Sequence, residues 1–235
     1  MSLSLLEPGN DYVINIEHLS GGGQTDIFGL IVFDESFNTI TVNAFNPPAG
    51  DINDVALDDG GAKFDGALYV ILDDGAGGWI APTGPIGYDL STDGTLWELD
   101  SGNSGPSVDF TLNLSLVDLD LFFGAVTTLD ISGNFESGNS NNEDNTIFLT
   151  ANDVLEMTDG MTILGDAPGN NSLGETVNLV DPDGGDAFAW QNINDLGGGD
   201  DQGVFDTWAF TDGSTTIASL LIEDSITVID NVASV

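Results

Sequence analysis

The chain has almost no positive charge. Its 235 residues include one lysine, Lys63, and no arginine, against 40 aspartate and glutamate residues, so the formal net charge at pH 7 is −39. Proteins that bind nucleic acid or an anionic membrane surface use Lys and Arg to neutralise phosphate groups. We therefore expect neither partner, and salt bridges cannot contribute much to the stability of this fold.

The chain also lacks cysteine and has a single histidine, His18. Disulfides and Cys/His zinc sites are excluded, and a Ser-His-Asp triad would depend on His18 alone. His18 continues a strand face with Tyr12, Ile14 and Ile16, so we interpret it as a structural residue. Carboxylate pairs for glycoside hydrolysis stay open in so acidic a chain, but no particular pair stands out. We predict that the protein is not an enzyme.

No apolar run approaches the length that a membrane-spanning segment needs. The N-terminal sequence Met1–Glu7 lacks the basic region and the apolar core of a cleavable signal peptide. We therefore expect no membrane insertion. These features leave three possibilities open: the protein is cytoplasmic, it leaves the cell without an N-terminal signal, or the chain is a mature form.

The kind of acidic residue suggests a cation. Aspartate outnumbers glutamate by thirty-one to nine, and seven aspartates are followed directly by glycine. Short carboxylates in flexible loops are the ligands that Ca²⁺ prefers, and self-repulsion at this charge favours a bound cation. Asp-Gly is also a common tight-turn sequence, and an acidic surface also suits a protein adapted to high salt. We predict Ca²⁺ as the cofactor and keep both alternatives open.

Dense groups of oxygen ligands mark the candidate calcium sites. None has the spacing of an EF-hand loop, and "GGGQTDIF" (21–28) lacks the fourth glycine of a calcium-binding nonapeptide repeat, so we interpret it as a glycine turn. The candidates occur in "DINDVALDDGG", "DPDGGD" and "NDLGGGDDQGVFD". The predicted metal ligands are Asp51, Asn53, Asp54, Asp58, Asp59, Asp181, Asp183, Asp186, Asp200 and Asp201.

Alternation of apolar and polar residues dominates the chain. Short alternating runs separated by Asp, Gly and Asn are typical of an all-β protein with little helix, and we predict β-sandwich modules of Ig-like or jelly-roll-like type. The longest run is Val108–Leu116, after which the apolar phase shifts by one residue at Val117, as at a bulge. The polar run 132–145 divides the chain into predicted domains 1–133 and 144–235; a single domain with one long loop is the alternative.

Four tryptophans are widely spaced along the chain. A carbohydrate-stacking face would use clustered aromatic residues, so we interpret these as core residues and keep sugar binding as a minority alternative. They are Trp79, Trp97, Trp190 and Trp208.

The stretch "TANDVLEMTDGMTILGD" (150–166) changes periodicity in the middle. Apolar residues at helical spacing predict a short helical turn over Ala151–Met157, and the apolar run Met161–Leu164 predicts a strand. Asp153, at the start of the turn, is better placed to cap it or to bind Ca²⁺ than to act as a catalytic acid.

This stretch, "GETVNLVDPDGGDAFAW" (174–190) and "VFDTWAFTDGSTTIASLLIEDSITVID" (204–230) occur in an order that resembles a C-terminal module of large bacterial surface adhesins and biofilm-matrix proteins exported by type I secretion. The resemblance covers about residues 145–230. Gly174-Glu175 replaces the usual second Gly-Asp of the family pattern. The matching positions are Asp153–Leu155, Thr158, Asp159, Gly165, Asp166, Val177, Leu179, Trp190 and Leu220–Ile222.

The resemblance implies secretion, an all-β extracellular module and calcium dependence. On this basis the predicted function is that of a secreted, calcium-stabilised structural protein that self-assembles into an extracellular matrix, surface layer or filament. Self-association through exposed edge strands, or through the N-terminal segment 2–16, would be the physical means. The alternative is a cell-surface adhesin module that binds a polysaccharide or a host surface.

Overall fold

The computed structural model describes residues 6, 10–20, 27–34, 39–45, 65–77, 79–80, 86–100, 110–116, 126–132, 144–157, 160–165, 174–181, 188–193 and 205–232. The chain forms two compact units, one of residues 1–89 with 101–110 and one of residues 90–100 with 111–235. The polar run at 132–145, which the sequence suggested as a boundary, falls within the second unit. The predicted division into 1–133 and 144–235 thus differs from this grouping.

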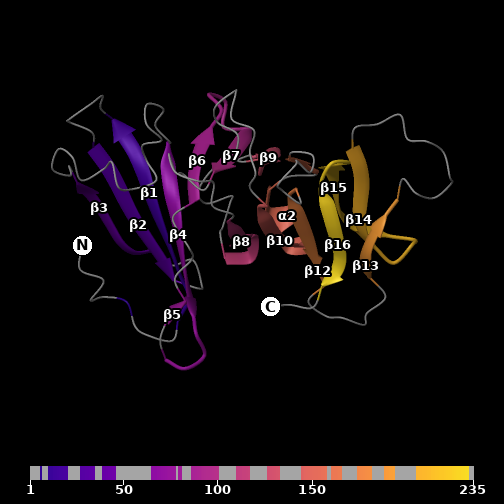
Figure 1. Cartoon of the computed structure of the whole chain (residues 1–235), viewed down its shortest axis with the longest axis horizontal. Coiled ribbons are helices and arrows are strands. Elements are labelled where there is room, and N and C mark those ends of the chain that lie inside the picture. The colour runs from indigo at the N-terminus through magenta and orange to yellow at the C-terminus, as the bar shows by residue number, and fades with distance from the viewer. Residues whose placement is uncertain are drawn as a thin grey trace. The chain divides into compact units, whose positions relative to one another are not determined.

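The first unit contains an antiparallel sheet. Its strands are β1 (Tyr12–Ser20), β2 (Ile27–Asp34), β3 (Thr39–Phe45), β4 (Gly66–Asp73), β5 (Trp79–Ile80) and β6 (Ile86–Leu90). The order is β6-β4-β1-β2-β3, with β5 paired to β4 (Figure 1). The central strand β1 therefore has a hydrogen-bonded neighbour on each edge.

Both faces of β1 are covered. Tyr12, Ile14 and Ile16 are buried, as the alternation predicts, and so are the residues between them, including Asn15. The buried Tyr88 hydroxyl donates a hydrogen bond to Asn15 Oδ1 at 2.9 Å. A Cβ at Gly66 would lie 2.3 Å from Tyr88 Cζ, so glycine is required where the tyrosine ring crosses β4.

The second unit contains two sheets, and the chain contributes strands to both of them in turn. Sheet I has the parallel strands β7 (Leu96–Asp100), β9 (Thr128–Asp130), β11 (Met161–Leu164) and β15 (Thr216–Glu223). The antiparallel strands β14 (Phe205–Thr211) and β13 (Ala189–Asn192) extend sheet I beyond β15. Sheet II has β8 (Thr111–Asn113), β10 (Thr146–Thr150), β12 (Thr176–Val180) and β16 (Thr227–Val232), all parallel.

Apart from the β13–β14 hairpin, successive strands from β7 to β16 alternate between the two sheets, so the chain winds as a parallel solenoid. Each circuit places one strand in sheet I and the next in sheet II, and equivalent residues stack at the same register. The inward-facing row of sheet II consists of Leu112, Ile147, Val177 and Val228. The matching inward-facing row of sheet I is fully buried. The sheet I row consists of Trp97, Leu129, Ile163 and Ile222.

The all-β prediction is confirmed, and the strand direction adds a feature that alternation does not encode. Ig-like and jelly-roll sandwiches have antiparallel sheets, whereas the solenoid strands of the second unit pair in parallel. Within the predicted run Val108–Leu116, the strand is the short β8 and residues Leu114–Leu116 form a 3₁₀ turn, η1. Phe110, Leu112 and Leu114 are buried as expected, and the phase shift at Val117 lies outside the described residues.

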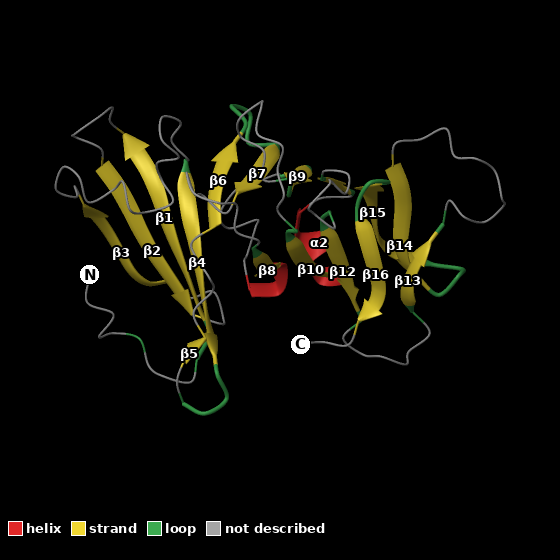
Figure 2. Ribbon diagram, in the orientation of Figure 1, coloured by secondary structure: helices red, strands yellow, loops and turns green. Residues whose placement is uncertain are grey.

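The described part of the chain has one α-helix, α2 (Ala151–Met157), directly after β10 (Figure 2). Its bounds, and those of β11, are the ones that the sequence predicts. Asp153 Oδ2 accepts a hydrogen bond from the Thr150 amide, and the Asp153 amide donates to Thr150 Oγ1 at 3.2 Å. This reciprocal pair is a capping box, in which the aspartate occupies the third helical position. The expectation that Asp153 caps the turn is confirmed.

An aromatic cluster closes the core beside the β13–β14 hairpin. The ring of Phe210 lies 5.4 Å from that of Trp190 and 6.0 Å from that of Phe188, centre to centre. The Trp190 indole N–H donates to the Val180 carbonyl at 3.2 Å, which ties the hairpin to the end of β12. Trp97 and Trp190 are buried, in line with their interpretation as core residues, whereas Trp208 is half-buried and the side chain of Trp79 is not described.

The two faces of β15 predict mutational effects of different size at adjacent positions. Ile222 is fully buried and Leu221 is 40% exposed. We expect Ile222→Ala to lower the free energy of unfolding by about 2–5 kcal/mol, because it leaves a cavity between the sheets. Leu221→Ala, the matched control, should cost less than about 1 kcal/mol. Chemical denaturation measures both, and equal losses would contradict the inward assignment of Ile222.

Candidate functional site

The carboxylates of three Asp-Gly pairs stabilise tight turns. Asp74 Oδ1 accepts a hydrogen bond from the Ala76 amide at 2.7 Å, and Asp212 Oδ1 accepts from the Ser214 and Thr215 amides at 2.8 and 2.7 Å. Asp93 Oδ1 accepts from the Thr95 amide at 3.2 Å. The following glycines have φ of 68°, 84° and 73°, respectively, a conformation that side chains with a Cβ avoid. The turn interpretation of Asp-Gly is confirmed at these three positions.

Two of these carboxyl groups have lowered pKa values. The Ser91 hydroxyl, followed by the Thr95 hydroxyl and amide, holds the pKa of Asp93 below the ordinary value of 3.8. The Ser214 amide, then its hydroxyl and the Thr215 amide, do the same for the pKa of Asp212. Neutral donors stabilise both charges, as expected in a chain with almost no cationic side chains.

A second set of carboxylates lies at the corner where the chain passes from sheet I to sheet II. Glu223 Oε2 accepts a hydrogen bond from the Gly165 amide at 3.1 Å, and Asp144 Oδ1 accepts from the Gly174 amide at 3.2 Å. Glu175 is only 1% exposed, and its Oε2 would lie 3.2 Å from a Cβ at Gly165. A Cβ at Gly165 would lie closer still to Ile226 Cγ1, at 2.8 Å, so the glycine leaves room for the Ile226 side chain and for the buried Glu175 carboxylate.

Among the ten predicted calcium ligands, Asp181 falls in the part of the chain that the structure describes. It directly follows β12 and is 7% exposed. Within the described ranges no three acidic or histidine side chains gather in a way that could hold a metal ion. The other nine predicted ligands lie outside the described residues, namely Asp51, Asn53, Asp54, Asp58, Asp59, Asp183, Asp186, Asp200 and Asp201.

The outer face of sheet II has a regular chemical pattern. Every strand of the sheet begins with a threonine, and the parallel register places the four in one row. The outer threonines of this row are exposed at its two ends and half-buried in the middle. The row consists of Thr111, Thr146, Thr176 and Thr227.

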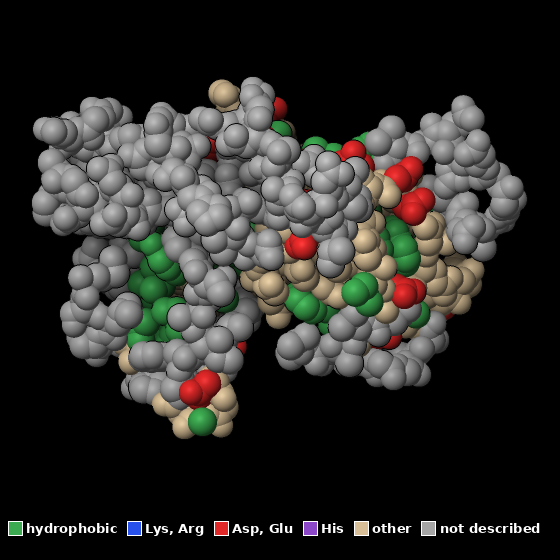
Figure 3. All heavy atoms as spheres, in the orientation of Figure 1, with side chains coloured by type: hydrophobic (Ala, Val, Ile, Leu, Met, Phe, Trp, Pro, Cys, Tyr) green, Lys and Arg blue, Asp and Glu red, His purple; other side chains and the backbone are tan. Residues whose placement is uncertain are grey.

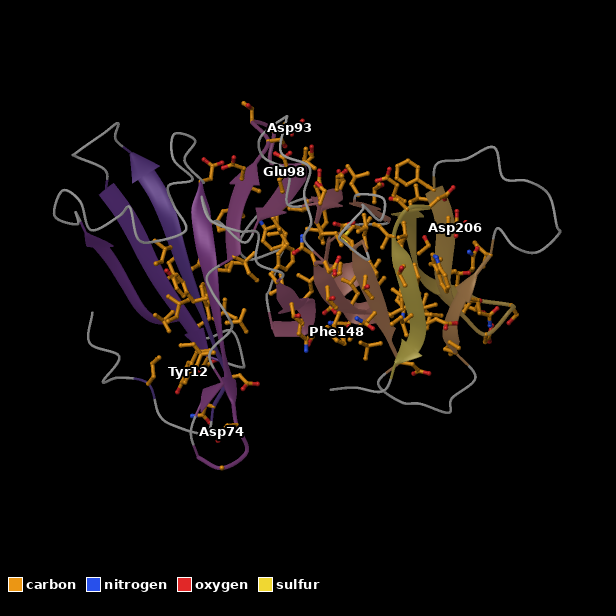
Figure 4. The ribbon with its side chains drawn as sticks, viewed as in Figure 1. Tyr12, Asp74, Asp93, Glu98, Phe148 and Asp206 are labelled. Carbon is orange, nitrogen blue, oxygen red and sulfur yellow. The ribbon has the colours of Figure 1, made fainter. Side chains whose placement is uncertain are left out.

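A second outward row runs beside the threonines, two residues further along each strand. It contains one aromatic residue, Phe148, between Asn113 and Asn178, and it ends at Ile229, which is 48% exposed (Figure 4). Asn178 Nδ2 donates to the Ile147 carbonyl at 3.5 Å, and Asn113 Oδ1 accepts from the Ser115 amide at 3.1 Å. We call these eight residues the threonine face.

The threonine face carries no charged residue, although the whole chain has a net charge of −39. The surface over β12 and β16 is accordingly mostly tan and green in Figure 3. The described strands of sheet II contain one acidic residue, Asp230, at the irregularity near the end of β16. On sheet I, by contrast, the equivalent second outward row includes Glu98 and Asp130 at adjacent positions.

No protein-family model, curated protein or solved structure matches the chain. Among the described residues, no helix is both long and apolar enough to span a membrane.

Sequence reasoning missed the threonine face. The signal was present, because each sheet II strand begins Thr-aliphatic, as TLN, TIF, TVN and TVI. The spacing between these triplets is unequal, and the largest interval contains the β13–β14 hairpin. A search for a fixed repeat length would not detect them.

The lowered pKa of Asp212 predicts a contribution to acid stability. The native carboxylate holds its charge to lower pH than the unfolded one, so its stabilisation is present above pH 3.8 and is lost as pH falls through the native pKa. Asp212→Asn should therefore reduce the change in melting temperature on acidification below about pH 4.

NMR titration of the Asp212 carboxyl provides the direct measurement. Ser214→Ala removes one hydroxyl donor and leaves the two amide donors, so it should raise the Asp212 pKa only part of the way towards 3.8. An Asp212 pKa at or above 3.8 in the unmodified protein would contradict the turn geometry.

Proposed function

We propose that this chain is a secreted, calcium-stabilised structural protein that self-assembles into an extracellular matrix, surface layer or filament. The observation that carries the proposal is the in-register parallel sheet II, whose end strands β8 and β16 each have one hydrogen-bonded neighbour among the described strands. An unpaired sheet edge is a template for adding a strand from another molecule.

The two ends of sheet II have matching chemistry at two of three equivalent positions. Strand β8 offers Thr, Leu and Asn, and β16 offers Thr, Val and Ile at the equivalent register positions. If β16 of one molecule pairs with β8 of the next, the threonine row and the inner aliphatic row both continue across the junction. Such a head-to-tail contact does not close on itself and generates a filament unless its rotation forms a ring.

The N-terminal segment is a poorer means of assembly than the sequence suggested. Residues 12–16 pair with β2 on one edge and with β4 on the other, so both of their edges are used within the chain. The strands that could pair with a strand of another molecule are therefore the end strands of the sheets, which include β3 in the first unit.

Charge supports calcium as the stabilising ion. A net charge of −39 destabilises any compact state through self-repulsion, and one lysine cannot offset it. The described carboxylates obtain partial stabilisation from amide and hydroxyl donors, which leave their negative charge in place. A divalent cation that binds the folded state would neutralise charge and stabilise the fold. Together with the resemblance of residues 145–230 to adhesin modules, this supports export by type I secretion and folding outside the cell.

Electron microscopy of the purified protein tests the assembly. We expect regular filaments or sheets in millimolar CaCl₂ and their loss in EGTA. A variant with lysine at the exposed Ile229 should assemble less, because a charged side chain would interrupt the outer row at the β16 edge; Ile217→Lys, at a 42% exposed position of β15, is the matched control. Monodisperse monomers under both conditions would contradict the proposal.

Thermal melts separate calcium binding from adaptation to salt. We expect millimolar CaCl₂ to raise the melting temperature in a saturable way and EGTA to reverse the effect, because specific sites fill at low concentration. Molar KCl screens charge without filling such sites. Equal stabilisation by KCl and CaCl₂ would instead support the high-salt alternative.

A further inference from the structure

We propose that the threonine face is a binding site for an uncharged, extended polysaccharide chain. The inference goes beyond assembly, since it concerns the flat outer surface of sheet II and not the edges of its end strands. It bears on the alternative function, a cell-surface adhesin module that binds a polysaccharide, and it names the class of polysaccharide and the surface that would bind it.

The first argument is the unsatisfied hydrogen-bonding capacity of the row. Adjacent strands lie about 4.8 Å apart, whereas a hydroxyl hydrogen bond needs about 2.8 Å between oxygens, so stacked threonines in the same rotamer do not bond one another. Among the described residues, the hydroxyls of Thr111, Thr146, Thr176 and Thr227 make no hydrogen bond. The row thus presents four donor–acceptor groups at a constant interval.

Other threonine hydroxyls of this protein do make hydrogen bonds within the chain. The Thr211 hydroxyl donates to the Thr215 carbonyl at 2.8 Å, and the Thr95 hydroxyl donates to Asp93 Oδ1 at the same distance. The Thr150 hydroxyl accepts from the Asp153 amide in the capping box. These hydroxyls stabilise turns and a helix, whereas those of the threonine face remain available to a ligand.

The second argument is the position of Phe148. It lies in the middle of the second row, between two side-chain amides, in register with Asn113 and Asn178. Asn178 is only 7% exposed, so the polar groups that a ligand would meet beside the ring are the threonine hydroxyls and the Asn113 amide. An aromatic ring beside such groups offers both an apolar surface and hydrogen bonds. A sugar ring has the complementary surface, with C–H groups on its faces and hydroxyls at its rim. The strand interval is also comparable with the length of one sugar unit in an extended β-linked chain.

The absence of charged residues on the threonine face favours an uncharged polysaccharide over a charged one. The chain has a net charge of −39, which repels an anionic polymer within the Debye length of about 8 Å. An uncharged polysaccharide avoids that repulsion, and an anionic one does not. The face itself carries no charge, so it offers nothing to a cationic ligand.

Sheet I supplies a matched control surface. Thr128 and Thr162 are neighbours in a parallel row there, with the same register geometry as Thr146 and Thr176. The row beside them carries Glu98 and Asp130, so this surface is acidic (Figure 4). Removing hydroxyls from this pair should leave polysaccharide binding unchanged.

The experiment measures co-sedimentation of the protein, in CaCl₂, with cellulose and chitin as uncharged polymers and with calcium alginate gel as the anionic one. We expect binding to at least one uncharged polymer and not to alginate. The double variant Thr146→Val/Thr176→Val should bind about tenfold more weakly, because it removes two hydroxyls and keeps the side-chain shape. Phe148→Ala should weaken binding to a similar degree, and Thr128→Val/Thr162→Val should bind as the unmodified protein does.

Circular dichroism melts of each variant establish that it is folded before binding is compared. Absence of binding to both uncharged polymers would overturn the inference, as would equal losses in the sheet I and sheet II double variants. Analytical ultracentrifugation of the same variants identifies the competing occupant: if Thr146→Val/Thr176→Val breaks an oligomer and leaves cellulose and chitin binding intact, the face contacts a second copy and the inference is wrong. Loss of filaments without loss of polymer binding would affect only the assembly proposal.

Discussion

Parallel in-register stacking is the constraint on which the second unit depends. Because each solenoid circuit repeats the register of the one before, a residue type that recurs at one position becomes a continuous row on the surface or in the core. The same pairing thus produces the buried row that includes Trp97 and Ile163 and the outward row of threonines. The core and the candidate binding surface are consequences of one arrangement.

The near absence of cationic side chains explains how the loops are built. A carboxylate in this chain can rely on backbone amides and hydroxyls, and the turns at Asp93 and Asp212 show this directly. Asp144 and Glu223 accept hydrogen bonds from backbone amides at the corners in the same way. The threonine face remains uncharged, which distinguishes it from the rest of a strongly acidic surface.

Local features could be predicted from the sequence, whereas long-range pairing could not. The bounds of α2 and β11 follow from a change of periodicity, and the capping role of Asp153 follows from its position in the first turn. Alternation in β10 or β12 is the same whether the neighbouring strand runs parallel or antiparallel, so the solenoid was not foreseen. The threonine face depends on that pairing. The abundance of Asp suggested calcium ligands, yet at Asp74, Asp93 and Asp212 the same residue type stabilises turns.

Strand direction in sheet II is therefore the central claim, and dipolar broadening between paired spin labels tests it directly in a chain without native cysteine. Cysteines for labelling would replace Thr146 and Thr176 in one variant, Thr150 and Val180 in a second, and Thr146 and Val180 in a third. The parallel register places the backbones of the first two pairs about 5 Å apart and of the third about 14 Å apart. Strong broadening in the first two variants and weak broadening in the third is the predicted result. Strong broadening in the third variant, with weak broadening in the first two, would show antiparallel pairing and contradict the solenoid.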